Sequence, residues 1–309
     1  MRVVVIFNPI AGRSRGERVA QAAYKHLTDY GFEVELCSTS RSEDAMRISE
    51  KSAGDADIVV AVGGDGTINE VVNGMARYEV HREQINANNT IMGRKIKPAL
   101  GIIPTGTVNV LALELGIPFQ VKKACDIIAQ NKRMPLDLGK VNERWFTLMT
   151  GVGIDALTIH NIDLKIKKRF RELAFLGTGL KVGLASPMPE FLVRINGEEH
   201  LVTFFVAGNS RYYGGRFAGM TPKADPTDGL LDLLLFKGTK RSSLAVFWLG
   251  VPTNLHLQNS KVLYLHGEKA ELLPLDHEQV VWFQTDGELA GQLPATVEID
   301  HHALEVLVL

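Results

Sequence analysis

The chain has 309 residues, a formal net charge of -1 and a hydrophobic fraction of 45%. A chain of this length usually exceeds what one hydrophobic core serves, so two domains are expected. The near-neutral charge argues against nucleic acid as a partner, and the two cysteines, Cys37 and Cys125, lack metal or redox spacing. We therefore expect a cytoplasmic protein without a signal peptide or a membrane-spanning helix.

The first part of the chain alternates short apolar segments with segments of helical periodicity. Strands are predicted over residues 3–7, 32–36, 58–62 and 100–103. Helices are predicted over residues 17–30, 44–53, 67–76 and 121–130, with a further helix starting near residue 110. This alternation is typical of a parallel sheet with helices on its faces. Residues 77–97 are polar, and we predict an exposed loop or excursion there.

After Pro135 the pattern changes to short apolar segments separated by turns such as Asn196-Gly197 and Asp286-Gly287. Strands are predicted over residues 136–141, 145–150, 191–195, 201–207, 230–236, 262–265, 270–273, 280–284, 297–299 and 303–309. Residues 155–184 are the exception, because they form a basic segment of helical character. The fold expected is an N-terminal three-layer α/β domain (1–134) and a C-terminal, mainly antiparallel β-sandwich domain (135–302), with residues 303–309 able to pack back on the first.

Three glycine-bearing loops follow predicted strands of the first domain. In the central loop, Gly63, Gly64 and Gly66 stand between a strand and a helix, which brings free N–H groups and a positive dipole end toward an anion such as phosphate. Asp65 within this loop would repel a phosphate unless a cation lay between them, so it indicates Mg²⁺. The other loops span residues 8–12 and 104–109. One such loop alone could serve turn geometry only, but parallel connections bring all three to one sheet edge and favour a nucleotide site.

These loops and three later motifs together resemble the diacylglycerol kinase catalytic superfamily of lipid kinases. The matching motifs, in chain order, are Asn8-Pro9-x-x-Gly12, Gly63-Gly64-Asp65-Gly66-Thr67-x-Asn69-Glu70, Pro104-x-Gly106-Thr107-x-Asn109, Asp137-Leu-Gly139-Lys-Val-Asn142, Pro222-x-Ala224-x-x-x-Asp228-Gly229-Leu230-Leu231 and Asp286-Gly287-Glu288. The resemblance implies a fold shared with NAD kinases. It also implies ATP- and Mg²⁺-dependent phosphorylation of a lipid hydroxyl in a cleft between the domains, with the protein transiently at the inner face of a membrane.

The resemblance also implies a role for individual residues. The ATP contacts it implies are Asn8, Gly12, Thr39, Gly64, Asp65, Gly66, Thr67, Asn69, Glu70, Thr107 and Asn109. Glu288, with Asp286 beside it, resembles the general base of these kinases. Asp65 and Asp137 resemble the members of a carboxylate–water–magnesium network. A structural Mg²⁺ is implied at Asp225, Asp228 and Leu230. Arg13 and Arg18 resemble positions that bind phosphate or lipid head groups.

Each of these motifs has a simpler interpretation when it is taken alone. Asp-Gly is among the commonest hairpin turns, so Asp286 and Asp228 could serve turns without any ligand. Asp137 could be satisfied by turn amides, and Arg13 and Arg18 could be solvated residues at a helix start. The combination of motifs over almost the whole chain favours the enzyme.

Two positions depart from the family pattern, and they leave the lipid open. Val110 and Leu113 stand where many bacterial diacylglycerol kinases have Asp and Arg. The basic segment 162–184 could lie on an anionic membrane or line an acyl-chain pocket. The oligomeric state, including a homodimer, is also left open.

Other classes of protein remain as alternatives or are excluded. An NAD kinase shares the Gly-Gly-Asp-Gly-Thr loop, and a non-catalytic lipid- or nucleotide-binding regulator could retain the fold. A Rossmann dehydrogenase is disfavoured because the first loop lacks Gly-x-Gly-x-x-Gly, and no P-loop Gly-Lys-Ser/Thr is present.

Overall fold

The computed structural model describes residues 1–87, 97–153, 156, 188–212, 219–276 and 278–309. The chain divides into two compact units. Unit 1 comprises Met1–Leu138 and His301–Leu309, and unit 2 comprises Gly139–Asp300. Strands β5 (Arg133–Val141) and β16 (Ala295–Leu307) each contain residues of both units.

Unit 1 is built on a parallel sheet. Its strands lie in the order β2 (Glu33–Ser38), β1 (Arg2–Phe7), β3 (Ile58–Gly63), β4 (Ala99–Pro104) and the end of β16. All neighbouring pairs along this order are parallel, and the register of the last pair joins Glu305 to Ala99. Every residue of β3 and β4 is buried, as expected for strands that are covered on both faces.

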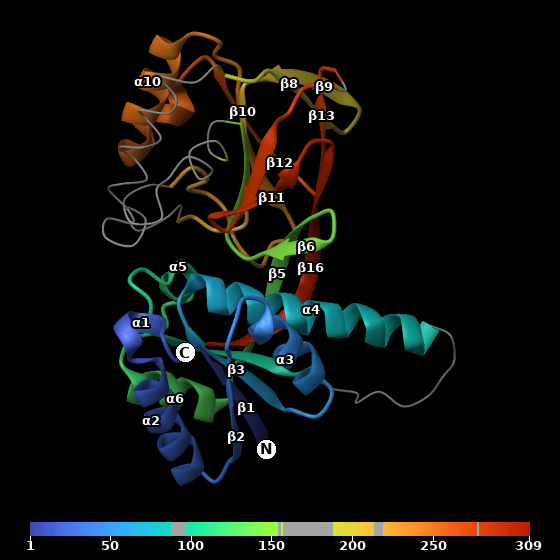
Figure 1. Cartoon of the computed structure of the whole chain (residues 1–309). Helices are drawn as coiled ribbons and strands as arrows, with labels where there is room; N and C mark the ends of the chain where they lie inside the picture. Colours follow the sequence, from blue (N-terminus) through green and yellow to red (C-terminus); the bar gives the residue numbers. More distant parts are fainter. Residues whose placement is uncertain (88–96, 154–155, 157–187, 213–218, 277) are drawn as a thin grey trace. The chain divides into compact units, whose positions relative to one another are not determined.

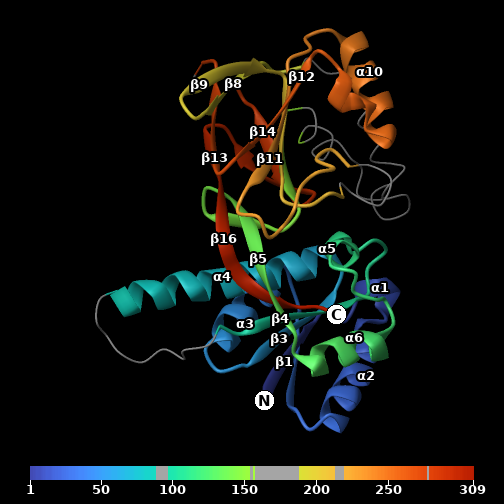
Figure 2. The ribbon, with the colours of Figure 1, turned by 180° about the vertical axis from the view of Figure 1, so that it is seen from behind.

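Helices cover both faces of the unit 1 sheet. Helices α2 (Gly16–Asp29) and α6 (Val121–Gln130) contact each other and lie on one face, and α3 (Asp44–Ala53) and α4 (Asp65–Ala87) pair on the other (Figures 1 and 2). Their small and apolar residues at helical spacing, such as Ala20, Ala23 and Leu27 of α2, face the sheet. Two short helices, α1 (Ala11–Ser14) and α5 (Val110–Glu114), follow the first and third glycine loops.

Unit 2 is antiparallel. A six-stranded sheet has the order β12 (Val262–Gly267), β11 (Leu231–Phe236), β10 (Phe204–Gly208), β7 (Met149–Gly153), β14 (Trp282–Thr285) and β15 (Glu288–Gln292). The first half of β16 pairs with β13 (Lys269–Pro274), which continues to β8 (Phe191–Ile195) and β9 (Glu198–Val202). Strand β6 (Arg144–Phe146) pairs with β5.

A hydrophobic core lies among the described residues of unit 2. Apolar side chains from both sheets, including Phe191, Phe205, Leu233 and Val297, are fully buried in a single cluster. The connection from β11 to β12 carries α10 (Arg241–Gly250) and two 3₁₀ turns, η1 (Val251–Thr253) and η2 (Leu255–Gln258). Alternating apolar residues on facing strands therefore produce the sandwich that the sequence predicts.

The predicted fold class is confirmed: an α/β domain with a parallel sheet precedes a domain of mainly antiparallel sheets. The predicted hairpin turns are also present, with Asn196 and Gly197 both at positive φ between β8 and β9.

Several predicted elements are wrong in extent. The predicted loop at 77–97 is helical as far as Ala87, because Glu79 and Arg82 are not solvated but form an ion pair of 2.5 Å along α4. The predicted strands 297–299 and 303–309 are one long strand, β16, whereas 145–150 and 201–207 are each divided between two strands. Strand β15 and helix α10 were not predicted. The predicted helical segment 155–184 lies almost entirely outside the described residues.

Within the described ranges, no helix combines the length and the apolar character that are needed to cross a bilayer.

Candidate functional site

The first and third glycine loops of unit 1 meet at Gly12. Gly12 has φ +58°, and a Cβ added there would lie 2.6 Å from the carbonyl oxygen of Thr105. The second and third loops meet at Gly64 and Gly106, where a Cβ on Gly106 would lie 2.8 Å from the Cα of Gly64. The expected convergence of the three loops is therefore present, and the absence of side chains is what permits it.

Hydrogen bonds fix the third loop on the end of β3. The carbonyl oxygen of Gly63 accepts the N–H of Thr105 at 2.9 Å and the side-chain amide of Asn109 at 2.8 Å. Asn109 is fully buried and left-handed, with φ +50°. Among the described residues, its Oδ1 has no hydrogen-bond partner, and a Cβ on Gly106 would lie 2.6 Å from it. A buried acceptor of this kind is costly unless a ligand or water satisfies it.

Asp65 opens α4 and also organises the neighbouring short helix. Its Oδ1 accepts the backbone N–H of Val110, the first residue of α5, at 2.6 Å. Val110 thus contacts Asp65 through its backbone N–H, while its apolar side chain stands where the resemblance expects a carboxylate. The N-terminus of α4, with its positive dipole end, lies directly after Gly64 and next to the third loop.

Some residues predicted to bind the nucleotide have clear structural partners. Both carboxylate oxygens of Glu70 accept backbone N–H groups at the start of α3, from Glu43 and Ala45, each at 3.1 Å. Asn69 is buried and accepts the side-chain amide of Asn73. Glu70 therefore joins α4 to the start of α3, whereas the contact between Asn69 and Asn73 lies within α4.

The remaining predicted nucleotide residues lie at strand ends or on the loops. Thr39 follows β2, and its N–H donates to Phe7 at 2.9 Å. Asn8 follows β1, and its Oδ1 accepts the N–H of Ile10 at 3.1 Å. Thr107 is exposed on the third loop. These three residues thus lie at the carboxyl ends of parallel strands, where ligands bind in open α/β sheets.

The two predicted head-group arginines lie on the first two helices. Arg13 belongs to α1, and Arg18 is exposed on the first turns of α2.

This arrangement fits a phosphate-bearing ligand. The second and third loops approach each other closely at Gly64 and Gly106, the N-terminus of α4 offers N–H donors, and Asp65 offers an oxygen ligand for a hard cation. The residues present are therefore suited to a triphosphate with Mg²⁺.

In unit 2, Asp286 holds the turn between β14 and β15. Its Oδ2 accepts the N–H and the hydroxyl of Thr147, at 2.9 and 3.0 Å, and its Oδ1 accepts the N–H groups of Leu148 and Met149, at 2.9 and 3.1 Å. Asp286 has φ +48° and Gly287 has φ +81°, as a tight Asp-Gly hairpin requires. The carboxylate of Asp286 is therefore an anchor that positions the turn.

Glu288 is the first residue of β15, and its side chain is 55% exposed. Arg144 donates to its Oε2 at 2.6 Å. Arg144 could not be predicted from the sequence, because more than a hundred residues separate it from Glu288 and no local pattern joins the two. Glu288 is thus accessible and pairs with Arg144. The carboxylate of Asp286, in contrast, accepts hydrogen bonds from residues 147–149.

The acidic motif at residues 225–230 forms two successive turns that are closed by carboxylate side chains. Oδ1 of Asp225 accepts the N–H and hydroxyl of Thr227, and Oδ1 of Asp228 accepts the N–H of Leu230 at 3.0 Å. Gly229 has φ +75°. The three residues predicted to hold a structural Mg²⁺ thus share one loop, and both carboxylates are exposed there.

Asp137 is fully buried on β5, and its partners include His301 and His302 of β16. Neither histidine was singled out from the sequence, although the adjacent pair His301-His302 is itself a visible signal for metal binding.

Comparison with known families gives the class of the protein. The family model described as "Diacylglycerol kinase catalytic domain" matches residues 2–141, and the one described as "YegS C-terminal NAD kinase beta sandwich-like domain" matches residues 149–308. The chain belongs to the diacylglycerol kinase catalytic-domain superfamily and is, by that membership, a lipid kinase.

Individual relatives extend over nearly the whole chain. A diacylglycerol kinase of Bacillus subtilis (strain 168) is 27% identical over 300 residues, covering 95% of this chain and 91% of the relative. One of Staphylococcus epidermidis (strain ATCC 12228 / FDA PCI 1200) is 28% identical over 307 residues, covering 97% and 90%. A solved structure of a diacylglycerol kinase from Bacillus anthracis str. Sterne has the same fold, with a TM-score of 0.75, 21% identity, and coverage of 100% of this chain and 96% of that one.

Proposed function

We propose that this lipid kinase transfers the γ-phosphoryl group of ATP to the hydroxyl of a diacylglycerol-like lipid and requires Mg²⁺. The observation that carries the proposal is the meeting of the three glycine loops at Gly12, Gly64 and Gly106 beside the N-terminus of α4. The names of the curated relatives support the choice of lipid, since they are diacylglycerol kinases.

In this proposal the unit 1 loops bind the nucleotide. Backbone N–H groups at the start of α4 bind phosphate oxygens, and Gly64 and Gly106 let the backbone approach them closely. The buried Oδ1 of Asn109 supplies an acceptor for a donor group or water of the bound ligand. Asn8, Thr39 and Thr107 complete the contacts at the strand ends.

Unit 2 supplies the base. Glu288 accepts the proton of the lipid hydroxyl as its oxygen attacks the γ-phosphorus, and ADP is the leaving group. Asp286 keeps Glu288 in place through the anchored turn, and Arg144 holds its carboxylate on the exposed side of β15. The two carboxylates thus have different tasks because their surroundings differ.

Magnesium would be held by Asp65, with Asp225, Asp228 and Leu230 as a second, structural site. When bound at Asp65, Mg²⁺ supplies charge neutralisation on the phosphate oxygens. Asp65 meanwhile keeps the N–H of Val110, so the ion's ligand is fixed in position by α5.

The direct test is transfer of label from γ-³²P-ATP to lipid in mixed micelles, with Mg²⁺ and a panel of purified lipids separated by chromatography. We expect label in diacylglycerol, and its loss in Glu288→Gln. Label in another lipid would show that this lipid, and not diacylglycerol, is the phosphoryl acceptor. Label in NAD added as the sole acceptor would support an NAD kinase, and ATP binding without transfer to any acceptor would support a regulator.

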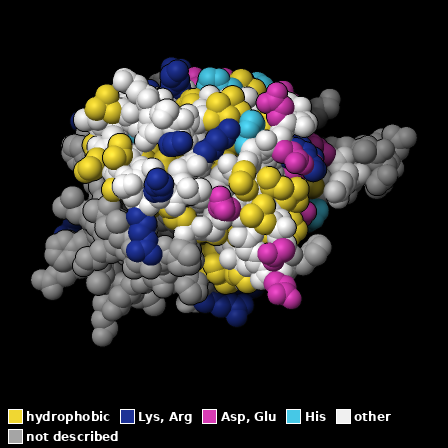
Figure 3. Space-filling view, turned by 90° about the horizontal axis from the view of Figure 1, so that it is seen from above, with side chains coloured by type: hydrophobic (Ala, Val, Ile, Leu, Met, Phe, Trp, Pro, Cys, Tyr) yellow, Lys and Arg dark blue, Asp and Glu magenta, His cyan; other side chains and the backbone are white. Residues whose placement is uncertain are grey.

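We also propose that unit 2 contacts the membrane through α10. Val246 and Leu249, three residues apart on this helix, are 61% and 76% exposed, and Lys240 and Arg241 stand exposed at its start. The face of the molecule in Figure 3 carries hydrophobic side chains with lysine and arginine among them, and acidic and histidine side chains as well. Apolar side chains flanked by cations favour an anionic bilayer surface. The basic segment 162–184, predicted for this role, lies outside the described residues.

Sedimentation with phosphatidylglycerol vesicles tests this contact. The double substitution Val246→Ser and Leu249→Ser should reduce the pelleted fraction, whereas Leu201→Ser, at another exposed apolar position of unit 2, should not. Equal loss in both proteins, or no loss in either, would contradict a role for α10.

A further inference from the structure

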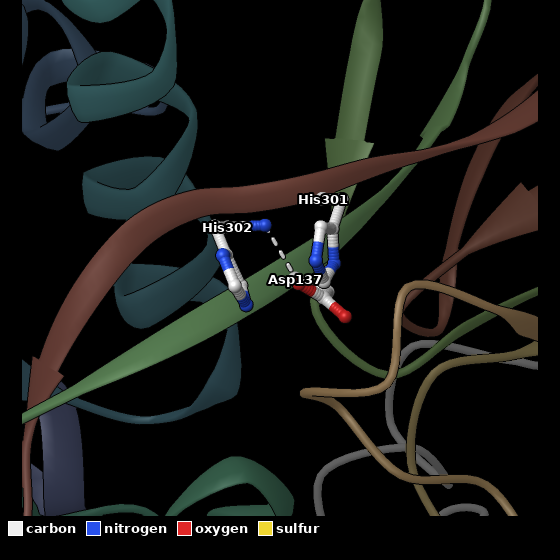
Figure 4. Close-up of side chains that lie close together, drawn as sticks. All are labelled: Asp137, His301 and His302. Carbon is white, nitrogen blue, oxygen red and sulfur yellow. Dashed lines mark hydrogen bonds and ion pairs between the residues drawn. The ribbon is translucent and has the colours of Figure 1, made fainter.

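Three side chains that can bind metals gather where β5 lies beside β16 in unit 1. Asp137 comes from β5, and His301 and His302 are consecutive on β16 (Figure 4). Each offers one ligand atom, and these atoms lie within 4.8 Å of one another. Among the described residues, these are the histidine, cysteine, aspartate or glutamate side chains that lie close enough, in a group of three or more, to share one ion.

The carboxylate is the fixed member of the group. Asp137 is 0% exposed, and its Oδ1 accepts the backbone N–H of His302 at 2.7 Å and lies 2.9 Å from Nδ1 of His301. A carboxylate removed from water is stable only when donors or cations compensate it. These contacts fix the Asp137 oxygen beside the His301 imidazole and within 4.8 Å of a ring nitrogen of His302.

The two imidazoles lie on the same side of the strand because the backbone is irregular there. Successive side chains of a regular strand point to opposite faces, but His302 has φ +53°, and the rings stack with centroids 3.7 Å apart and an angle of 28° between their planes. Both histidines are exposed, so their rings can turn about their side-chain bonds while Asp137 stays in place.

We propose that Asp137, His301 and His302 form a binding site for a divalent transition metal of the Zn²⁺ or Co²⁺ type, with water completing the coordination. Two imidazole nitrogens and one carboxylate oxygen match the ligands of open tetrahedral zinc sites. Magnesium prefers oxygen ligands in octahedral geometry, so the paired histidines select against it at Asp137. Binding separates the stacked rings, since lone pairs in two nearly parallel planes do not converge on one ion.

This assignment changes the role that the resemblance implied for Asp137. A carboxylate in a carboxylate–water–magnesium network would lie among oxygen ligands, whereas here a ring nitrogen of each of two histidines lies within 4.8 Å of it. The proposal does not depend on the kinase activity, because the site is formed within unit 1 by residues of β5 and β16 alone.

Titration of the full-length protein, without a polyhistidine tag, with Co²⁺ alone tests the site through the visible absorption of the bound ion. We expect one Co²⁺ per chain, displaced by Zn²⁺ and retained in a large excess of Mg²⁺. His301→Asn and His302→Asn should each weaken the Co²⁺ affinity by at least about 10-fold, because loss of a direct ligand costs no less than loss of a residue that merely supports one. Asparagine is chosen because it tolerates the positive φ at position 302.

His81→Ala serves as the matched control, because His81 is an exposed histidine of unit 1 that pairs with Glu50, 3.3 Å away on α3. Its Co²⁺ affinity should equal that of the parent protein. The proposal is overturned if no Co²⁺ binds, if Mg²⁺ displaces it, or if the His301 and His302 substitutions leave the affinity unchanged. Because both positions are exposed, thermal melts should show that these variants remain folded.

Discussion

The glycine loops of unit 1 and the Asp286-Gly287-Glu288 turn of unit 2 reach their geometry in different ways. The loops depend on missing side chains: Gly12 lies against Thr105, and Gly64 against Gly106. The turn depends on one carboxylate, since Asp286 accepts four hydrogen bonds from residues 147–149. One region is therefore shaped by backbone contact and the other by side-chain hydrogen bonding.

This difference separates binding from chemistry in the proposed reaction. Backbone N–H groups on closely packed glycine loops suit a phosphate chain, which needs many hydrogen-bond donors. A single accessible carboxylate, Glu288, suits proton transfer, which needs one group in one position. Substitutions in the two regions should accordingly change different measured quantities.

The largest effect is expected at Glu288. Glu288→Gln removes the proposed base while keeping size and hydrogen bonding to Arg144, so kcat should fall by about 10²- to 10⁴-fold. Initial rates of phosphoryl transfer measure this. Glu268→Gln, at an exposed position before β13, is the control and should retain the parent rate. A Glu288→Gln enzyme with near-normal kcat would remove Glu288 from the mechanism.

Asp286 should affect folding before it affects chemistry. Asp286→Ala removes four hydrogen bonds and places alanine at φ +48°, so the free energy of unfolding should fall by about 3 kcal/mol. Asp286→Asn, which keeps an acceptor and tolerates the positive φ, should lose less. Urea denaturation followed by fluorescence measures both. Equal stability of the alanine variant and the parent would show that the turn does not depend on this carboxylate.

A smaller and pH-dependent effect is expected at Asp44 in unit 1. The hydroxyl and N–H of Ser40, with the guanidinium of Arg47, hold the pKa of the buried Asp44 carboxyl well below its usual range. A lowered pKa in the folded state stabilises the fold above the unfolded pKa of about 4, and this stabilisation is lost as the pH falls further.

Asp44→Asn should therefore lower the urea midpoint at pH 7 and reduce its decline between pH 5 and pH 3. Urea titrations at these three pH values measure both quantities. A variant with the same acid dependence as the parent would contradict the assignment of this pKa shift to Asp44.

The smallest effect concerns thiol reactivity. Burial raises the pKa of Cys125 on α6 to about 12, and burial also raises the pKa of the half-buried Cys37 thiol. Because the thiolate is the reactive form, native protein at pH 8 should label slowly at Cys37 and not at Cys125. Mass spectrometry after reaction with a thiol reagent measures this. Rapid labelling of Cys125 would show that α6 opens in the native state.

The sequence predicted the glycine loops because their requirement is local: Gly64 and Gly106 follow strands and precede helices, and no distant partner is needed to recognise them. It did not predict that Glu70 holds the start of α3, that Arg144 meets Glu288, or that His301 and His302 meet Asp137. Each of these contacts joins residues far apart in the chain, so no local periodicity records it. The helix from 77 to 87 was not predicted for a related reason. Charged residues such as Glu79 and Arg82 suggest an exposed loop in the sequence, although in the structure they pair along α4.

If the unit 1 loops bind ATP and Glu288 acts only in catalysis, calorimetry of Mg²⁺-ATP binding should separate the two roles. A Cβ on Gly64 would lie 3.6 Å from the Cα of Gly106, an ordinary contact, so Gly64→Ala should fold with parent stability. We expect Gly64→Ala to bind ATP at least about 10-fold more weakly, because its methyl group would stand in the way of the phosphates, and Glu288→Gln to bind ATP normally. Unchanged ATP affinity in Gly64→Ala would contradict ATP binding at the loops, and lost affinity in Glu288→Gln would contradict a purely catalytic role for Glu288.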